Sequence, residues 1–260
     1  MIAIAGVSKT YGTGIQAIPA LQDIHLAVAP GEFVCLLGPS GCGKSSLLNI
    51  VAGFLQPDTG QVLLDGAKVT KPGPDRGMVF QEYALFPWMT VEENVAFGLE
   101  IKGARPQDIG PRVGSLLRSL GLAEFRKRYP KDLSGGLRQR VAIARIMALN
   151  PPVMLMDEPF GALDALTRRT LQDELLRIWD ASRKTVLFVT HSIEEALYLG
   201  TRVAVMTFRP GRIKRDMHIE LPRPRNTSGR VFNELKRELE VLVMEEQARY
   251  SEAERLGRPG

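Results

Sequence analysis

The sequence predicts an α/β protein with a parallel core sheet, an antiparallel β subdomain at the N-terminus and an inserted helical subdomain. Three observations support this fold class: alternating apolar segments near the start, three short and continuously apolar runs, and a helix-rich stretch between the first and second of those runs. At 260 residues the chain is long enough for one large domain with a substantial core.

The first predicted elements are half-buried strands. A period of two between apolar residues is typical of strands with one buried face, and a turn at 58–60 separates two of these segments. We expect these strands to pair in antiparallel fashion. The alternating positions are Ile2 and Ile4, then Ile24, Leu26 and Val28, then Val62 and Leu64.

Residues 33–37, 153–156 and 186–189 are apolar without alternation, and each run is bounded by polar or turn residues. Such runs are typical of strands covered on both faces, as in a parallel sheet. Helical patterns stand between and after them, at 45–52, 137–149, 166–179 and 193–199.

The middle of the chain, 83–150, is predicted to be a mainly helical subdomain inserted in the core, with breaks at Pro106, Pro111, Gly121 and Pro130. After Arg223 the composition becomes charged, and apolar residues at near-helical spacing over 231–247 predict a terminal helix. We therefore expect one main domain over 1–225 and a C-terminal helical tail over 226–260.

Composition sets limits on the class of protein. The net charge of +5 is compatible with anionic partners or with an ordinary solvated surface, and by itself favours the second. No apolar run approaches the roughly 18 residues of a membrane span, and the start lacks the features of a secretory signal. We expect a cytoplasmic protein in which Cys35 and Cys42 are reduced.

Residues 38–45 fit the phosphate-loop pattern of a glycine, four variable residues and Gly-Lys-Ser, between a predicted strand and a predicted helix. The glycines let backbone amides converge on phosphate oxygens at the positive end of the new helix. Lys44 would reach the β- and γ-phosphates and Ser45 would bind Mg²⁺, which predicts a phosphate-loop NTPase core of the RecA-like kind. The alternative is a glycine-rich turn without a ligand. The predicted nucleotide-binding residues here are Gly38, Pro39, Ser40, Gly41, Cys42, Gly43, Lys44, Ser45 and Ser46.

Polar residues also follow two of the buried runs. Asp157 would hold Mg²⁺ and Glu158 would act as general base toward water, although an acidic pair after a strand is by itself more often a helix N-terminal cluster. His191 would bind the γ-phosphate, although a lone histidine is more often structural. The upstream phosphate loop favours the catalytic interpretation of all three.

Residues 133–140 read Leu-Ser-Gly-Gly-Leu-Arg-Gln-Arg and resemble the signature of ATP-binding-cassette (ABC) proteins. Ser134 can cap the following helix while Gly135 and Gly136 let the backbone approach a phosphate, which makes a second anion site. Taken alone, Ser-Gly-Gly is an ordinary cap. The resemblance implies a head-to-tail dimer in which the signature of one chain closes over ATP on the phosphate loop of the other.

Other ABC elements occur in the family's order, over about residues 2–223. Tyr11 resembles the aromatic residue that stacks on adenine, although it is equally compatible with a turn residue. Gln81 resembles the Q-loop glutamine, which contacts Mg²⁺ and the attacking water, and Asp164 lies in a segment that resembles the D-loop of the dimer interface.

The segments Phe86-Pro87-Trp88 and Ala-Leu-Thr-Arg at 165–168 resemble importer ATPases for nitrate, taurine and aliphatic sulfonates, and the short tail agrees with that branch. The resemblance implies ATP hydrolysis that drives a separate membrane permease, served indirectly by a solute-binding protein, at the cytoplasmic face of the membrane. Phe86, Pro87 and Trp88 are candidates for the permease contact; a buried packing cluster is the alternative.

Two other functions stay open from the sequence. One is an importer ATPase for a different small solute. The other is a non-transport ABC ATPase that acts on nucleic acid or ribosomes, but the basic run at 126–128 with Lys131 is too short to favour a nucleic-acid partner.

Overall fold

The computed structural model describes residues 1–255, which fall into two compact units. One unit consists of residues 1–73 together with the chain from Thr185 onward, and the other consists of Pro74–Lys184. The last five residues of the predicted tail, 256–260, lie outside the described residues.

The first unit begins with an antiparallel sheet, as predicted. Ile2 pairs with Val28 and Ile4 with Val62, and both isoleucines are buried, so the alternating apolar positions form the inner face. Its strands lie in the order β2, β1, β4, β5, with bounds β1 Ile2–Tyr11, β2 Ile18–Val28, β4 Thr59–Leu64 and β5 Ala67–Lys68.

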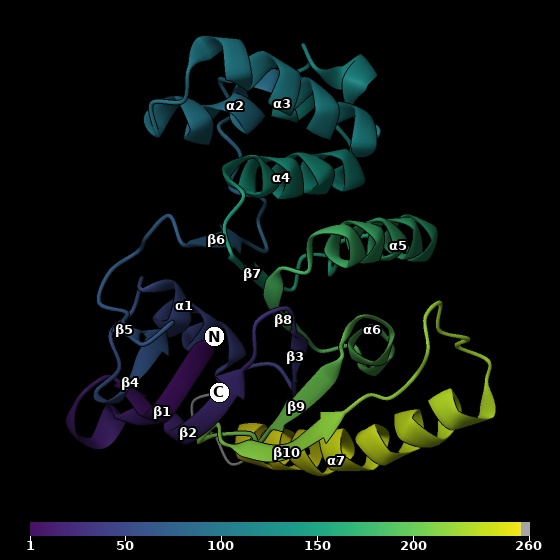
Figure 1. The fold of residues 1–260 in the computed structure, drawn as a ribbon. Coiled ribbons are helices and arrows are strands. Elements are labelled where there is room, and N and C mark those ends of the chain that lie inside the picture. The colour runs from purple at the N-terminus through teal and green to yellow at the C-terminus, as the bar shows by residue number, and fades with distance from the viewer. Residues whose placement is uncertain (256–260) are drawn as a thin grey trace. The chain divides into compact units, whose positions relative to one another are not determined.

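The same unit contains the parallel strands predicted from the continuously apolar runs. β3 (Phe33–Leu37) lies between β8 (Thr185–Thr190) and β9 (Arg202–Met206) and is parallel to both, while β10 (Ile213–His218) is antiparallel to β9. Every residue of β3 and β8 is buried, because helices pack against this sheet (Figure 1). The helices of this unit are α1 Lys44–Ala52, α6 Ile193–Leu199 and α7 Arg230–Arg255, with a short 3₁₀ helix at Gly14–Gln16.

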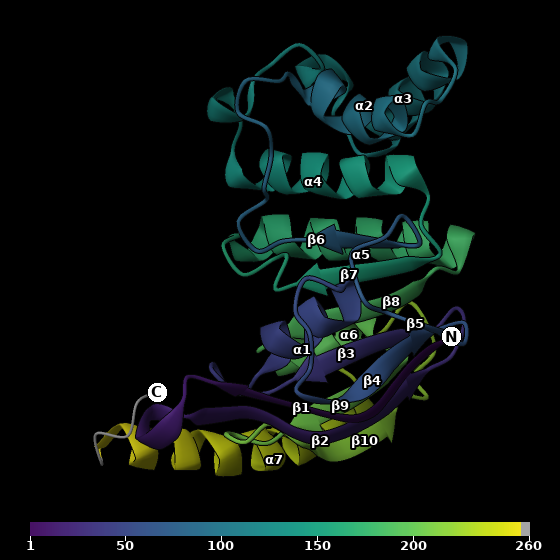
Figure 2. The same cartoon turned by 90° about the vertical axis from the view of Figure 1, so that its left-hand side faces the viewer.

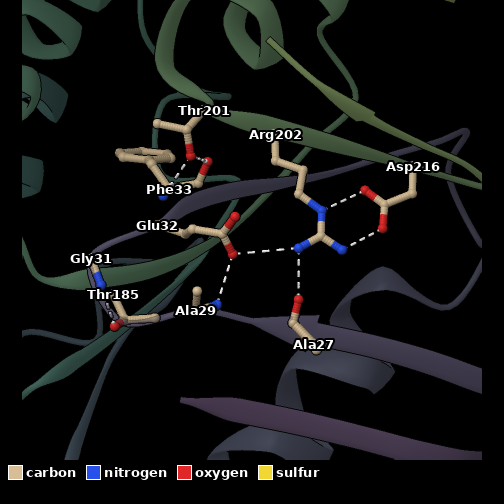
Figure 3. A network of polar contacts seen from close by, with 9 residues as sticks. All are labelled: Ala27, Ala29, Gly31, Glu32, Phe33, Thr185, Thr201, Arg202 and Asp216. Atoms are coloured by element: carbon tan, nitrogen blue, oxygen red, sulfur yellow. Dashed lines mark hydrogen bonds and ion pairs between the residues drawn. The ribbon is translucent and has the colours of Figure 1, made fainter. Parts of the chain in front are cut away.

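Arg202, the first residue of β9, holds the base of this sheet together. Its guanidinium makes a bidentate pair with Asp216 of β10 and donates to the carbonyl of Ala27 on β2 at 2.7 Å (Figure 3). It also lies 3.4 Å from the carboxylate of Glu32, which accepts the amide of Ala29. The hydrogen bond with Asp216 raises the pKa of Arg202, so the pairing stays charged. The start of β3, the strand that leads into the phosphate loop, is thereby fixed.

The second unit contains two parallel strands and a helical cluster. β6 pairs with β7, and helices α2, α3 and α4 share a buried apolar core (Figure 2). The strand and helix bounds are β6 Arg76–Val79, β7 Val153–Asp157, α2 Val91–Ile101, α3 Pro106–Ser119, α4 Gly135–Leu149 and α5 Ala165–Ser182. Short 3₁₀ helices stand at Ala123–Phe125 and Pro130–Asp132.

The predicted helix break at Pro111 is wrong, because Pro111 lies inside α3. A proline near the start of a helix removes one backbone bond, here to the carbonyl of Gln107, and the helix can continue if packing offsets the loss. Val113 and Leu117 of the same helix are 1% and 2% exposed, and their burial supplies that packing. Pro106, by contrast, begins α3 as the sequence indicates.

Across the described part of the chain, none of the helices combines the length and the apolar character needed to cross a membrane.

Candidate functional site

The phosphate loop joins β3 to α1 in a conformation that glycine alone adopts easily. Gly41 and Gly43 have φ values of +74° and +97°, in the left-handed region. A Cβ atom on Gly43 would lie 2.8 Å from the carbonyl oxygen of Ala20, so a side chain there would displace backbone. The loop is therefore built by close backbone packing.

Lys44 folds back across this loop. Its side chain is 4% exposed, and its ammonium group donates to the carbonyl oxygens of Gly38 and Pro39, each at 2.8 Å. These carbonyls are neutral acceptors and do not balance the buried positive charge of the ammonium group. A negatively charged phosphate group would balance it. The arrangement fits a phosphate ligand.

Cys42 is fully buried within the loop. Burial raises the pKa of its thiol, and the nearby Lys44 ammonium, 3.8 Å from Sγ, offsets this only in part. Cys35 is also buried, and both cysteines are free, which agrees with the expected reduced state. Because the thiolate is the reactive form, Cys42 should react slowly with alkylating reagents in this conformation.

Tyr11 and His191 lie at the same end of the first unit as the loop. The Tyr11 hydroxyl donates to Oγ of Ser46 at 3.0 Å, which places the tyrosine beside the first turn of α1. Its ring is half-exposed, as a stacking residue must be. His191 follows β8, whose last residue pairs with the last residue of β3, so it emerges at the edge where the loop begins.

In the second unit, Asp157, Glu158 and Gln81 share the carboxyl edge of two strands. Val79 of β6 pairs with Met156 of β7, so the residues that follow each strand emerge on the same side. Asp157 is buried and Glu158 is half-buried. Glu158 has a φ of +41°, a strained value for a residue with a side chain.

The signature segment begins α4. The Ser134 hydroxyl accepts the amide of Leu137 at 3.4 Å and caps the helix, as predicted. A Cβ on Gly135 would lie 3.3 Å from the Tyr83 hydroxyl, and one on Gly136 would lie 2.7 Å from a methyl group of Thr167. The first amides of the helix therefore lie beside Tyr83 and Thr167, which leave little room for a side chain at either glycine.

Asp164 caps α5, with its carboxylate accepting the amide of Thr167 at 3.0 Å. Hydrogen bonds from Thr167 hold the pKa of the Asp164 carboxyl below its usual range. Arg168, one turn along, donates to the carbonyls of Phe160 at 3.3 Å and Leu163 at 2.7 Å. The loop between Glu158 and Asp164 is thereby fixed from α5, a role that sequence reasoning did not give to Arg168.

Arg145 is a second residue that sequence reasoning missed. It is 8% exposed on α4 and donates to the carbonyls of Ala84 at 2.7 Å and Tyr83 at 3.3 Å. Those two residues have φ values of +48° and +57°. The sequence signal for a special role was the position of Arg145 as a charged residue on an otherwise apolar face of the helix. Arg145 holds the strained segment that follows Gln81 against the signature helix.

The two interpretations of this segment were a permease contact and a buried packing cluster, and each fits part of Phe86, Pro87 and Trp88. Phe86 is half-buried, with its ring 4.6 Å from that of Phe97, and Asn94 binds its backbone N–H and C=O. Pro87 is exposed, and Trp88 is 70% exposed. Phe86 is thus a packing residue, whereas Pro87 and Trp88 are available at the surface.

The ABC transporter family model matches residues 21–161, a span that includes the phosphate loop, the signature and the acid pair. The chain belongs to the ABC transporter family. It is 48% identical to an uncharacterized ABC transporter ATP-binding protein of Methanocaldococcus jannaschii, over 94% of this chain and 92% of that protein.

Two relatives of this ABC protein have named transport functions. One is an aliphatic sulfonates import ATP-binding protein of Bacillus cereus, 44% identical over 92% of this chain and 94% of the relative. Another is a taurine import ATP-binding protein of Roseobacter denitrificans, 52% identical over 78% of this chain and 75% of the relative.

Solved structures of ATP-binding cassettes have the same fold. A dimeric cassette in a post-hydrolysis state, bound to ADP and Pi, superposes with a TM-score of 0.76 at 35% identity, and covers 85% of this chain and 99% of its own. The predicted fold class is confirmed, and this ABC protein is an ATPase.

Proposed function

We propose that this ABC ATPase energises uptake of a small anion, such as a sulfonate, taurine or nitrate, through a separate membrane permease. The observation that carries this proposal is the similarity to both a sulfonate and a taurine import ATPase over most of the chain. Nitrate rests on the resemblance of the sequence segments around Trp88 and Arg168 to that importer branch.

We propose that Ser45, Asp157 and Gln81 hold a Mg²⁺ ion. Hydroxyl, carboxylate and amide oxygens are the donor types that Mg²⁺ accepts in nucleotide sites. When bound, the ion would supply charge neutralisation to the phosphate oxygens. Main-chain amides of residues 38–46 would bind the phosphates, and Tyr11 would stack on the adenine.

Hydrolysis would use the side chains of Glu158, Gln81, Lys44 and His191. Glu158 would accept a proton from the attacking water, and its strained backbone would aim the carboxylate. Gln81 would orient the same water, Lys44 would neutralise negative charge on the γ-phosphate, and His191 would hydrogen-bond that phosphate.

We further propose a head-to-tail dimer in which residues 134–136 of one copy and the phosphate loop of the other grip one nucleotide, with Asp164 near the interface. The dimeric state of the matched cassettes supports this assembly. ATP binding would close the dimer, and loss of phosphate would open it.

The membrane permease would bind at Pro87 and Trp88, which are exposed. This contact would place the subunit at the cytoplasmic face of the membrane. The solute-binding protein would act only indirectly, and we expect no nucleic-acid partner. In this proposal residues 1–225 form the ATPase domain, with 83–150 as its helical subdomain and 226–260 as a tail.

The test of hydrolysis is Glu158→Gln. We expect ATP binding to persist while kcat falls by roughly 100-fold or more, because the carboxylate that accepts the proton is lost. Size-exclusion chromatography with ATP should then show an accumulated dimer. Glu100→Gln, at an exposed site near the end of α2, is the matched control and should keep full turnover. Near-normal hydrolysis by Glu158→Gln would refute its role as the base.

The test of transport is reconstitution with the co-purifying permease, followed by uptake of labelled sulfonate, taurine and nitrate. ATP-dependent uptake of at least one anion is expected. Uptake of an unrelated solute alone would show that the proposed class of small-anion substrates is wrong. Recovery of the protein with ribosomes or DNA in place of a permease would favour a non-transport ATPase.

A further inference from the structure

The loop that joins β9 to β10, residues 207–212, packs directly against the phosphate loop although it lies outside the phosphate loop, the acid pair and the signature. A Cβ on Gly211 would lie only 2.2 Å from the carbonyl oxygen of Cys42. The Gly211 amide donates to Ala20 at 2.9 Å, and its carbonyl accepts the amide of Gln22 at 2.9 Å. This 207–212 loop is therefore tied both to β2 and to the nucleotide-binding backbone.

Arg209 is the side chain by which the 207–212 loop holds the phosphate loop. Its Nε donates to the carbonyl oxygen of Gly41 at 3.0 Å. Gly41 is exposed and has a φ of +74°, a conformation in which glycine is intrinsically free to move. Because a peptide group is planar, fixing the Gly41 carbonyl also fixes the Cys42 amide and the direction in which the loop continues.

The terminal helix α7 holds the 207–212 loop from the other side. Glu246 is fully buried, and its carboxylate accepts the backbone amide of Phe208 at 2.9 Å and the Lys214 ammonium at 2.6 Å. The ring of Tyr250 meets that of Phe208 edge-on, with centroids 5.2 Å apart. α7 runs beside β9 and β10 in Figures 1 and 2. The residue immediately before Arg209 is thus fixed to the tail helix.

We propose that Arg209 is a positioning residue for the phosphate loop, and that α7, acting through Glu246 and the 207–212 loop, sets the affinity of the loop for ATP. The contact orders the loop before ATP arrives, so binding loses less conformational freedom. Arg209 acts through Gly41, and its effect is therefore on binding rather than on the chemical step. The inference rests on the assignment of 38–45 as the ATP-binding loop.

The first experiment compares Arg209→Ala, Arg209→Lys and Arg212→Ala by ATPase kinetics and by the ATP-induced shift in melting temperature. Arg209→Ala should raise the KM for ATP by up to roughly tenfold, with kcat at saturation within about twofold. Arg209→Lys keeps a donor and should recover part of the affinity. Arg212 is an exposed arginine in the same loop, and its alanine variant should match the original protein. Unchanged KM and an unchanged thermal shift in Arg209→Ala would overturn the proposal.

The second experiment tests the link to α7 with Glu246→Gln against Glu245→Gln. Glu245 is exposed and also binds Lys214, so its variant controls for a lost ion pair. We expect a raised KM only for Glu246→Gln, in the same direction as Arg209→Ala and smaller. Equal KM values in the two variants would remove α7 from the proposal. If Glu246→Gln fails to fold, the Arg209 series still decides the positioning role.

Lys44→Ala separates this inference from the function on which it rests. Loss of ATP binding in Lys44→Ala with no effect of Arg209→Ala would refute the positioning role alone. Retained ATP binding in Lys44→Ala would instead refute the assignment of the phosphate loop.

Discussion

The phosphate loop and the signature segment both depend on paired glycines, but for different physical reasons. Gly41 and Gly43 have positive φ, and the Ala20 carbonyl together with the Leu21 side chain fills the space where a side chain on Gly43 would stand. Gly135 and Gly136 begin a regular helix, and a Cβ there would meet side-chain atoms of Tyr83 and Thr167. Gly41 and Gly43 are needed because the backbone has positive φ, whereas Gly135 and Gly136 are needed because neighbouring side chains leave little space. Replacing glycine by alanine should therefore have different consequences in the phosphate loop and in the signature.

The two segments also differ in how they are supported. The phosphate loop is packed against backbone of β2 and of the 207–212 loop. The segments around the signature are instead held by long side chains, since Arg145 fixes the backbone after Gln81 and Arg168 fixes the loop before Asp164. The phosphate loop adds one such contact, from Arg209 to the carbonyl of Gly41, to its backbone packing.

The largest predicted effect is that of Gly43→Ala. The new methyl group meets the Ala20 carbonyl and the left-handed φ disfavours alanine, so we expect a loss of roughly 1–3 kcal/mol in unfolding free energy. ATP binding should be lost with it, because the loop backbone must move. Urea unfolding and nucleotide titration measure the two effects.

Gly136→Ala is the matched substitution in the signature. Among the described residues, the only atom that its Cβ approaches closely belongs to the Thr167 side chain, and alanine favours a helix by up to about 1 kcal/mol over glycine. Stability and ATP binding by the monomer should therefore be nearly unchanged while turnover falls. Equal destabilisation by the two alanines would contradict the distinction between a need for positive φ and a need for space.

An intermediate effect is predicted for Arg145→Met. It leaves the part-buried carbonyls of Tyr83 and Ala84 without this donor, and the loss of such hydrogen bonds costs about 0.5–1.5 kcal/mol. ATP affinity should stay within about twofold, since the phosphate loop is packed separately, whereas kcat should fall as Gln81 loses its support. The measurements are thermal unfolding and steady-state kinetics.

Arg112→Met, at an exposed site on α3, is the control for loss of an arginine and should behave as the original protein. Turnover that survives Arg145→Met undiminished would show that the strained segment needs no support from the signature helix.

Sequence patterns predicted correctly those elements whose first and last residues are determined by neighbouring turn residues and caps. β3 and α6 were predicted at their observed bounds, because turn residues and caps stand beside them. The terminal helix was predicted over 231–247 and extends to Arg255, since Tyr250 packs on Phe208, a contact between distant parts of the chain. The carbonyl partners of Arg145 and Arg209 were not predictable for the same reason, because they lie 61 and 168 residues away in the sequence.

A small effect on stability is predicted for Ser134→Ala, which removes a cap whose hydrogen bond is long and exposed. The expected loss is about 0.5–1 kcal/mol, at the low end for caps. Ser134→Asp keeps the cap and adds a negative charge at the helix start, where the dipole favours it. The aspartate variant should therefore unfold at or above the original temperature.

Turnover by Ser134→Asp then decides what the serine does. If residues 134–136 face the γ-phosphate of ATP on a second copy, the added charge repels it, and turnover and ATP-induced dimerisation should both collapse in a fully folded protein. If the serine is only a cap, the aspartate variant should hydrolyse ATP as fast as the original. The added negative charge stabilises the helix cap but repels a bound phosphate. Measuring stability and activity on this one variant therefore separates the capping function from the second anion site.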